Sequence, residues 1–297
     1  MSEVQDTFIG CEIDSGYKVV SLLGEGDFSS VYLAQSSDNA SIAVKVFHID
    51  ERFTTEDCEA EIAIHGMMNH PNIIRALFSG TIAPNESNYR YLAMEYASGG
   101  TLRDLLKQNA LPLEGRVELI LQCARALQYV HNMGEIHMDL KPVNLLLKDH
   151  SQGSYFFLSD FGTDARAHRL HKNPQTRGSI ILGTLGYMAP EQRLCQEVPA
   201  SDQFSLAVIA FRVITGVRPE VVFDVPPYFK DYATSDLSIV LEELEDVIRR
   251  GMAVNVSDRY ATVTEFAEAL LSSYRSGIEK QSRNTKVFDM NDSANES

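Results

Sequence analysis

Hydrophobic and polar residues alternate along the first third of the chain, and this alternation predicts strands. Three runs between residues 17 and 49, YKVVSLL, VYLAQ and SIAVKVFHI, are rich in β-branched and aromatic residues. The glycine-rich turn GEGDFSS separates the first two, and YRYLAMEY at residues 89–96 forms a fourth run. Residues 54–68 instead combine capping residues, early acids and helical spacing of apolar positions. The first third therefore predicts a β-rich lobe with one main helix.

Beyond residues 97–100 the spacing of apolar residues changes from a period of 2 to one near 3.6, which predicts helices. Two short apolar runs, at residues 145–147 and 155–159, interrupt them as expected strands. We therefore expect an α+β fold with a small lobe at residues 17–97 and a larger, mostly helical lobe at residues 98–272. Helices are expected at residues 101–108, 113–133, 200–216, 239–250 and 263–272.

The two ends of the chain are polar and only weakly periodic. Residues 1–16 are interpreted as an extension that packs on the first lobe, and residues 273–297 as a mobile tail. The N-terminus shows no basic stretch followed by an apolar one, so no signal peptide is predicted. The most apolar span, residues 204–216, is too short to cross a membrane and contains Arg212. We expect a cytoplasmic protein without a membrane span.

Composition narrows the classes of partner. Of 297 residues, 44% are apolar, which is enough for a substantial core. The 41 acidic and 26 basic residues give a formal net charge of -15, which disfavours binding to nucleic acid or to anionic lipid. The cysteines lie far apart and form no CxxC pair, which argues against a metal or redox motif and suits a reducing compartment. They are Cys11, Cys58, Cys123 and Cys195.

The candidate chemistry lies in the stretch HMDLKPVN, residues 137–144, between a predicted helix and a predicted strand. It places Asp139, Lys141 and Asn144 on one loop, and Asp160 follows the next strand in the triplet Asp-Phe-Gly. One carboxylate near a transferable proton, together with an Asn and a second Asp that can hold a hard cation, is what phosphoryl transfer requires.

These motifs resemble those of the eukaryotic-type (Hanks-type) Ser/Thr protein kinase family. The pattern H-R-D-L-K-P-x-N is matched except that Met138 replaces Arg, and D-F-G is intact at residues 160–162. The phrases GTLGYMAPEQ and SDQFSLAV are most similar to the bacterial branch of the family. The resemblance covers residues 17–272 and implies a bilobal kinase fold.

The resemblance assigns catalytic roles by position. Asp139 is expected to accept the proton of the substrate hydroxyl, and Lys141 to neutralise charge on the transferred group. Asn144 and Asp160 are the expected ligands of Mg²⁺.

Lys45 is expected to bind the α- and β-phosphates of ATP, held by Glu61, with Glu59 as the alternative partner. A lysine on an edge strand that points to solvent is the other interpretation of Lys45.

The family's nucleotide site is matched by a longer set of residues. The turn Gly24-x-Gly26 with Ser29 is expected to cover the phosphates, although such a turn alone is usually only a tight hairpin. Met94 takes the gatekeeper position, and the following residues form the hinge that bonds adenine. The expected nucleotide contacts are Gly24, Gly26, Ser29, Val31, Ala43, Lys45, Met94, Glu95, Ala97 and Leu146.

The resemblance also implies supporting contacts. Asp202 is placed to hold the backbone of the catalytic loop, and Arg259 to pair with Glu191 of the A-P-E triplet. Thr184 matches the Thr that bonds the catalytic Asp and Lys in Ser/Thr kinases. Residues 218–231, where the family usually has a helix that docks substrates, are Pro-rich and weakly periodic, which suggests that this helix is degenerate.

Between Asp-Phe-Gly and A-P-E lies an activation segment with six basic or His positions, for which a solvated surface is the default interpretation. These positions are Arg166, His168, Arg169, His171, Lys172 and Arg177.

Three departures refine the expectation. Met138 removes the Arg that binds a phosphorylated activation loop in many kinases, so we expect activity without strict dependence on that phosphate. Ser29, in place of the third Gly, is a mild change. Thr101 and Val143 stand where basophilic kinases carry acids, so no preference for an upstream Arg is predicted.

The sequence thus predicts an ATP- and Mg²⁺-dependent Ser/Thr protein kinase that acts on protein substrates and on itself; it predicts no oligomeric state. A pseudokinase scaffold is one alternative, but such proteins usually lose the Lys, the Asp or D-F-G, all of which are present here. A small-molecule phosphotransferase of the same fold is another, but it would lack the A-P-E and G-T-x-x-Y-M segment that receives a polypeptide.

Overall fold

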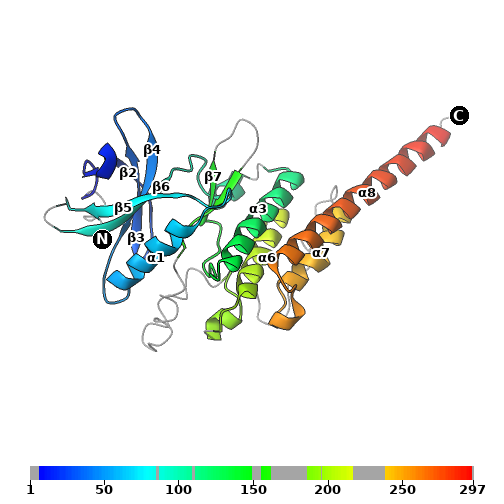
Figure 1. Cartoon of the computed structure of the whole chain (residues 1–297). Helices are drawn as coiled ribbons and strands as arrows, with labels where there is room; N and C mark the ends of the chain where they lie inside the picture. Colours follow the sequence, from blue (N-terminus) through cyan, green and yellow to red (C-terminus); the bar gives the residue numbers. More distant parts are fainter. Residues whose placement is uncertain are drawn as a thin grey trace. The chain divides into compact units, whose positions relative to one another are not determined.

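The structure is a computed structural model that describes residues 7–84, 87–108, 111–148, 155–161, 186–194, 196–216 and 238–295. The chain forms two compact units, Met1–Gly100 with Leu146–Gly178 and Thr101–Leu145 with Ser179–Ser297. The first unit holds an antiparallel sheet and one long helix, and the second is mostly helical (Figure 1). The expected α+β organisation is therefore confirmed.

The sheet of the first unit has six strands in the order β1-β2-β3-β4-β6-β5, and each neighbouring pair is antiparallel. Four of the strands were predicted from alternation. The edge strand β5 and the two-residue β1 were not, because β5 is half exposed and contains Ser79 and Gly80 where an apolar residue would mark a strand. The strands are β1 (Glu12–Ile13), β2 (Tyr17–Glu25), β3 (Ser29–Gln35), β4 (Ser41–Phe47), β5 (Ala76–Ile82) and β6 (Tyr89–Glu95).

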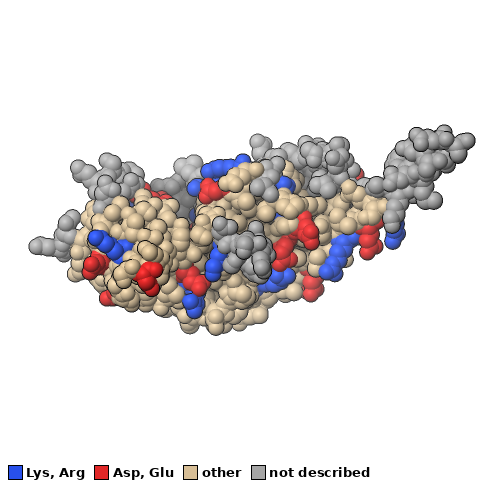
Figure 2. Space-filling view, turned by 90° about the horizontal axis from the view of Figure 1, so that it is seen from above, with Lys and Arg blue, Asp and Glu red and all other residues tan. Residues whose placement is uncertain are grey.

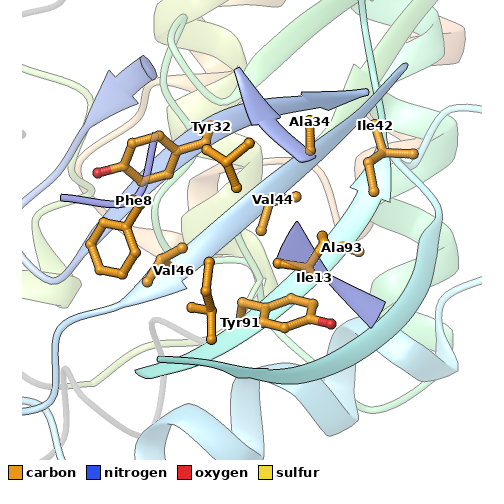
Figure 3. Packing of buried hydrophobic residues seen from close by; sticks show 11 residues of the cluster. Phe8, Ile13, Tyr32, Ala34, Ile42, Val44, Val46, Tyr91 and Ala93 are labelled. Carbon is orange, nitrogen blue, oxygen red and sulfur yellow. The ribbon is translucent and has the colours of Figure 1, made fainter. Parts of the chain in front are cut away.

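One face of the sheet is covered by the N-terminal segment. Side chains alternate along β4, so Val44 and its neighbours two residues away point to this face, where they join Phe8 and Ile13 in one buried cluster (Figure 3). The amide of Gly10 donates to the carbonyl of Val19 at 2.8 Å, and Phe8 is fully buried. The expectation that the N-terminal extension packs on the first lobe is confirmed for the part of the extension that the structure describes.

The other face of the sheet carries α1 (Thr55–Met67), which Figure 1 shows lying against the strands. Cys58 and Ile62 of this helix join the buried cluster on that face. The helix begins as predicted at Thr54: the amide of Asp57 donates to the Thr54 hydroxyl, and the Asp57 carboxylate accepts from the Thr54 amide at 2.8 Å. This capping box satisfies two of the free amides at the helix start.

A hairpin of β7 (Leu145–Lys148) and β8 (Tyr155–Leu158) packs with the first unit. The amide of Ile74 donates to the carbonyl of Leu158 at 2.9 Å, and Asn72 Nδ2 donates to the carbonyl of Phe156 at 3.1 Å. The sequence analysis placed these two strands in the second lobe. Their contacts with residues 72–74 join segments far apart in the chain, and such contacts leave no local signal in the sequence.

The second unit consists mainly of helices. Its most apolar helix, α6, is buried along nearly its whole length, begins with Pro199 in the first turn and ends at Gly216 with a φ of 78°. Pro in the first turn and Gly just past the last turn are common at helix ends, and the apolar helix expected at residues 200–216 is confirmed. The helices are α2 (Leu102–Gln108), α3 (Leu113–Asn132), α6 (Pro199–Thr215), α7 (Ser238–Gly251) and α8 (Val263–Asn295), with 3₁₀ turns at Glu191–Leu194 and Val256–Asp258.

The expected end of the last helix at Ser272 is wrong, because α8 continues to Asn295 (Figure 1). Gly277, which reads as a helix stop, instead lies against α7: a Cβ on it would be 2.8 Å from the Cα of Val240. An ion pair between Lys280 and Glu243 follows along the same contact. The glycine permits close packing of α7 and α8 and does not break the helix.

Several predicted features lie outside the described residues: Gly162, Thr184, the six basic or His positions of the activation segment, and residues 218–231. Among the helices that are described, none is long and apolar enough to cross a membrane. On the face that Figure 2 shows, acidic and basic side chains lie interspersed over the described part of the chain.

Candidate active site

Lys45 is the centre of the polar cluster in the first unit. It lies on β4 with its side chain only 8% exposed, and its Nζ donates to Glu61 Oε1 and, at 2.6 Å, to Asp160 Oδ1. Glu61 shares the sheet-facing side of α1 with Cys58, whereas Glu59 points away and bonds Arg90 at 2.7 Å. The pairing of Lys45 with Glu61 is therefore confirmed, and the alternative with Glu59 and the solvent-pointing interpretation of Lys45 are both wrong.

The charge state of Lys45 is set by its two carboxylate partners. Burial alone would lower the pKa of Lys45, but the carboxylates of Asp160 and Glu61 raise it above its usual range, so the side chain remains an ammonium ion. Two carboxylates contact this one ammonium ion. Because the Asp160 side chain is 39% exposed, its carboxylate is accessible to a ligand cation, and Lys45 offers a point charge of the kind that binds phosphate.

The glycine-rich turn between β2 and β3 is closed by one backbone bond, in which the amide of Gly26 donates to the carbonyl of Ser29 at 2.8 Å. Gly24 lies opposite Val31 in the antiparallel pair, and Val31 lies opposite Lys45 on the next strand. The turn is thus joined through β3 to the strand that carries Lys45.

The residues expected around adenine also meet in the first unit. Ala43 pairs with Met94 in the register of β4 and β6, and Met94 is buried. Ala97 and Leu146 pack against the same cluster as Met94. The amide of Glu95 donates to the carbonyl of Arg75 at 3.0 Å, which fixes the end of β6.

Gly99 holds β7 beside this hinge. Its amide donates to the carbonyl of Leu147 at 2.8 Å, and the amide of Leu147 donates to the carbonyl of Gly100 at 2.9 Å. A Cβ on Gly99 would be 2.8 Å from the Leu147 oxygen, so a side chain at this position would displace the strand. This close approach positions Leu146, which precedes Leu147 on the strand.

The catalytic loop lies in the second unit and brings its three predicted residues together. Lys141 Nζ is 2.8 Å from Asp139 Oδ2, and Asn144 Nδ2 donates to the Asp139 carbonyl at 2.8 Å and to its Oδ2 at 3.2 Å. The Asp139 carboxylate is therefore oriented by an amide and faces an ammonium ion. A carboxylate held in this way is suited to accept a proton from a bound hydroxyl.

Asp202 holds the backbone of this loop, as predicted. Its two carboxylate oxygens accept from the amides of His137 at 2.9 Å and Met138 at 2.8 Å. Met138 has a φ of 66°, a conformation that costs a non-glycine residue about 1 kcal/mol or more. Sequence reasoning missed two further contacts, Gln192 Nε2 on the Met138 carbonyl at 2.9 Å and His131 on Asp202 at 2.8 Å. Gln192 directly follows the A-P-E triplet, which was the available signal.

The predicted pair of Arg259 and Glu191 is confirmed. The guanidinium donates two parallel hydrogen bonds, at 2.7 and 2.8 Å, to the two carboxylate oxygens. Ser201 Oγ adds a third bond to Glu191 at 2.7 Å. Burial alone would raise the pKa of Glu191, but the bonds from Arg259 and Ser201 lower it below its usual value.

Metal ligation was predicted at Asn144 and Asp160. Among the residues that the structure describes, no group of three or more His, Cys, Asp or Glu side chains is placed to hold a metal ion. Mg²⁺ usually binds through one or two protein carboxylates together with phosphate and water, so an Asp carboxylate and an Asn oxygen are a fitting donor set without such a group. The partly exposed carboxylate of Asp160 fits this chemistry.

Comparison with known proteins agrees with this arrangement. Residues 17–273 match the protein kinase domain family. The chain is 31% identical over 302 residues to the serine/threonine-protein kinase Pkn1 of Myxococcus xanthus, covering 96% of this chain and 42% of Pkn1. It is 30% identical over 275 residues to PknB of Mycolicibacterium smegmatis, covering 86% of this chain and 42% of PknB.

A solved structure supports the fold. The kinase domain of PknI from Mycobacterium tuberculosis superposes with a TM-score of 0.67 at 25% identity, covering 89% of this chain and 98% of that domain. This likeness confirms the predicted bilobal kinase fold. The chain spans less than half the length of Pkn1 and PknB. By its match over residues 17–273, the chain belongs to the protein kinase domain family, and its relatives lie among the bacterial Ser/Thr kinases.

Proposed function

We propose that this chain is a Ser/Thr protein kinase that transfers the γ-phosphate of ATP to hydroxyl groups of protein substrates and of itself. The observation that carries the proposal is Lys45, a buried lysine held between Glu61 and the partly exposed Asp160. A folded protein rarely buries such a charge without a function or a structural pairing, and here one of the two partner carboxylates is 39% exposed and accessible to a ligand.

In this proposal the second unit supplies the proton chemistry. Asp139 orients the acceptor hydroxyl and takes its proton, and Lys141, 2.8 Å from that carboxylate, compensates negative charge on the transferred group. The Asn144 amide donates to the same carboxylate oxygen at 3.2 Å. Little covalent work is asked of the protein, because positioning and charge compensation supply most of the acceleration.

The first unit supplies the nucleotide contacts. Lys45 binds the α- and β-phosphates, and the turn at residues 24–29 covers them with backbone amides. Val31, Ala43 and Leu146 enclose the adenine ring, while the backbone of residues 95–97 bonds its edge. Asn144 and Asp160 would hold Mg²⁺, which would neutralise the phosphate charges.

The proposed substrates are proteins with Ser or Thr acceptors. The relatives Pkn1 and PknB are named serine/threonine-protein kinases, and Lys141 of this chain matches the Lys of the H-R-D-L-K-P-x-N motif. We place the reaction in the cytoplasm, because ATP is available there and the buried thiols of Cys58 and Cys123 remain reduced.

Met138 bears on regulation. Its side chain is buried and apolar, so it offers no cation to a phosphorylated activation loop. We expect a dephosphorylated preparation to retain activity. Inactivity after phosphatase treatment, with recovery on phosphorylation of the loop, would contradict this expectation.

The test of the function is phosphoryl transfer from radiolabelled ATP with Mg²⁺ to a generic protein acceptor. The wild type is compared with Lys45→Met, with Asp139→Asn and with the matched control Lys107→Met, whose lysine is exposed on α2. We expect label on Ser or Thr with the wild type and the control only. A wild type that binds nucleotide but transfers no label would overturn the proposal in favour of a scaffold.

A further inference from the structure

The glycine-rich turn is anchored by an aromatic side chain. Phe28, at the end of the turn, is 4% exposed, and its ring centroid lies 5.8 Å from that of Phe53. Phe53 in turn stacks on Phe47 at 5.8 Å. The three rings belong to the buried cluster on the face of the sheet that α1 covers. If the turn only had to cover phosphates, the Phe28 ring would not need to be buried in this cluster.

Phe53 also fixes the start of α1. It directly precedes the N-cap Thr54, and Cys58 occupies the fourth helical position. Both Phe53 and Cys58 are essentially fully buried in the same cluster. An apolar pair at these two positions is a hydrophobic staple, which sets the angle at which the chain enters a helix. Phe28 therefore contacts the ring that determines how α1 begins.

A second set of contacts holds Phe28 from the other side. The Arg52 guanidinium lies 5.1 Å from the centre of the Phe28 ring. Asp50 holds Arg52 through bonds of 3.0 and 2.7 Å and accepts from the Phe53 amide at 3.0 Å. The amide of His48 donates to the Phe28 carbonyl at 2.8 Å. Phe28 is thus held by its ring and by its carbonyl against residues 48–53, the segment that leads into α1.

These contacts continue to Lys45. Helix α1 carries Glu61, which bonds Lys45, and the Lys45 ammonium lies 5.5 Å from the centre of the Phe47 ring. We propose that Phe28 is a positioning residue, which couples the glycine-rich turn to α1 and so to the Lys45–Glu61 pair. The inference rests on the proposed function, because the turn is taken to cover the phosphates of ATP. By linkage, a nucleotide that draws the turn down then stabilises the start of α1, and an ordered α1 strengthens nucleotide binding.

The first experiment measures the KM for ATP of Phe28→Ala, Phe28→Leu and Phe78→Ala. Phe78 is the matched control, because it is a partly buried ring on the opposite face of the sheet, in contact with Tyr17 and Tyr91. We expect Phe28→Ala to raise the KM about threefold to tenfold, the effect of losing one aromatic contact. Phe28→Leu restores most of the affinity because it refills the apolar site, and Phe78→Ala leaves the KM unchanged.

The second experiment measures hydrogen exchange of the α1 amides with and without Mg²⁺ and a non-hydrolysable ATP analogue. We expect the nucleotide to protect α1 in the wild type and in Phe78→Ala, and to protect it less in Phe28→Ala. We also expect Phe28→Ala and Phe53→Ala to be non-additive in nucleotide affinity, since the two rings form one contact. A ring that only added stability would change none of these nucleotide-dependent differences.

The outcomes separate the two proposals. If the wild type transfers no phosphate, the proposed function is overturned. If the wild type is active but Phe28→Ala matches Phe78→Ala in KM and in nucleotide-dependent protection of α1, the coupling alone is overturned. A higher KM that Phe28→Leu rescues, together with loss of α1 protection, supports the coupling.

Discussion

Each of the two units buries a cationic side chain in contact with carboxylates, but the number and the exposure of these carboxylates differ. In the second unit, Arg259 has a side chain that is 0% exposed and forms two parallel bonds with a single carboxylate, Glu191. Its remaining N–H groups donate to backbone carbonyls, including those of Ala200 and Ala253. In the first unit, Lys45 is almost as buried but lies between two carboxylates, one of which is 39% exposed.

The difference favours a structural role for the Arg259 pair and agrees with the proposed role of Lys45 in nucleotide binding. The Arg259 site has balanced charge, and protein atoms accept from each of its nitrogens, so it has no need of a ligand. In the proposed function, the partly exposed Asp160 of the Lys45 site contacts a cation, and Lys45 itself binds phosphate. Burial alone would have placed both sites in one class; the number of carboxylates around each cation and the exposure of Asp160 distinguish them.

The largest effect on stability is expected at the Arg259–Glu191 pair. Arg259→Met leaves Glu191 buried without its partner, which should lower the free energy of unfolding by about 3–5 kcal/mol. Urea denaturation measures it. The double variant Arg259→Met, Glu191→Gln should lose less, because no buried charge remains uncompensated. Equal losses in the single and double variants would show that the charge pair itself matters little.

Removal of Lys45 should instead affect activity more than stability. Lys45→Met is expected to lower the rate of phosphoryl transfer roughly 100- to 1,000-fold, the effect of removing one preorganised cation. Its free energy of unfolding should fall less than that of Arg259→Met, because the exposed Asp160 remains hydrated and Glu61 can bind a proton. Both quantities are measured on the same preparations. A Lys45→Met protein as unstable as Arg259→Met would place both sites in the structural class.

The sequence predicted those contacts that depend on side chains at fixed motif positions. Lys45 with Glu61, Arg259 with Glu191 and the hold of Asp202 on the loop backbone were all expected, and the structure contains each of them. Long-range partners could be named because the motifs fix which residues meet, although up to 68 residues separate them in the chain. The change of hydrophobic period near residues 97–100 marked the boundary between the lobes, and the resemblance to the kinase family implied the bilobal fold.

What the sequence did not predict depends on packing between distant segments. Glycine often marks the end of a helix, and only the close approach of Gly277 to Val240 explains why this glycine lies inside one. Strand β5 pairs at the edge of the sheet with a weak alternation pattern. The burial of Phe28 in the α1 cluster follows from the folding of the turn onto the sheet, for which a single aromatic residue after two glycines gives no sign.

A smaller effect is expected at the support of the catalytic loop. Asp202→Asn keeps the shape but offers one acceptor oxygen to the two amides of His137 and Met138. One amide then faces an NH₂ group, which should lower the free energy of unfolding by about 1–3 kcal/mol. Because Met138 has a positive φ that these bonds stabilise, kcat should fall while the KM for ATP stays unchanged. A rise in that KM with unchanged kcat would contradict this positioning role. Glu118→Gln, at an exposed site on α3, serves as the control.

The smallest effect is a difference in acid stability that again contrasts the two sites. The pKa of Glu191 lies below its ordinary value of 4.5 because, despite burial, Arg259 and Ser201 stabilise the carboxylate. The unfolded chain therefore binds a proton at a higher pH than the folded chain does, so this contribution is complete above pH 4.5 and is lost as the pH falls through the folded pKa. Lys45, whose pKa is raised, keeps its own proton throughout that range.

The free energy of unfolding, measured by urea titration between pH 6 and 3, should consequently fall more steeply for the wild type than for Glu191→Gln. Other carboxylates titrate in both proteins, so the difference between the two curves isolates Glu191. Lys45→Met should retain the steep acid dependence of the wild type, since its Glu191–Arg259 pair is intact. The opposite result would be that Glu191→Gln keeps the wild-type slope while Lys45→Met loses it. In that case the structural ion pair would be the one at Lys45, and the roles of the two sites would have to be exchanged.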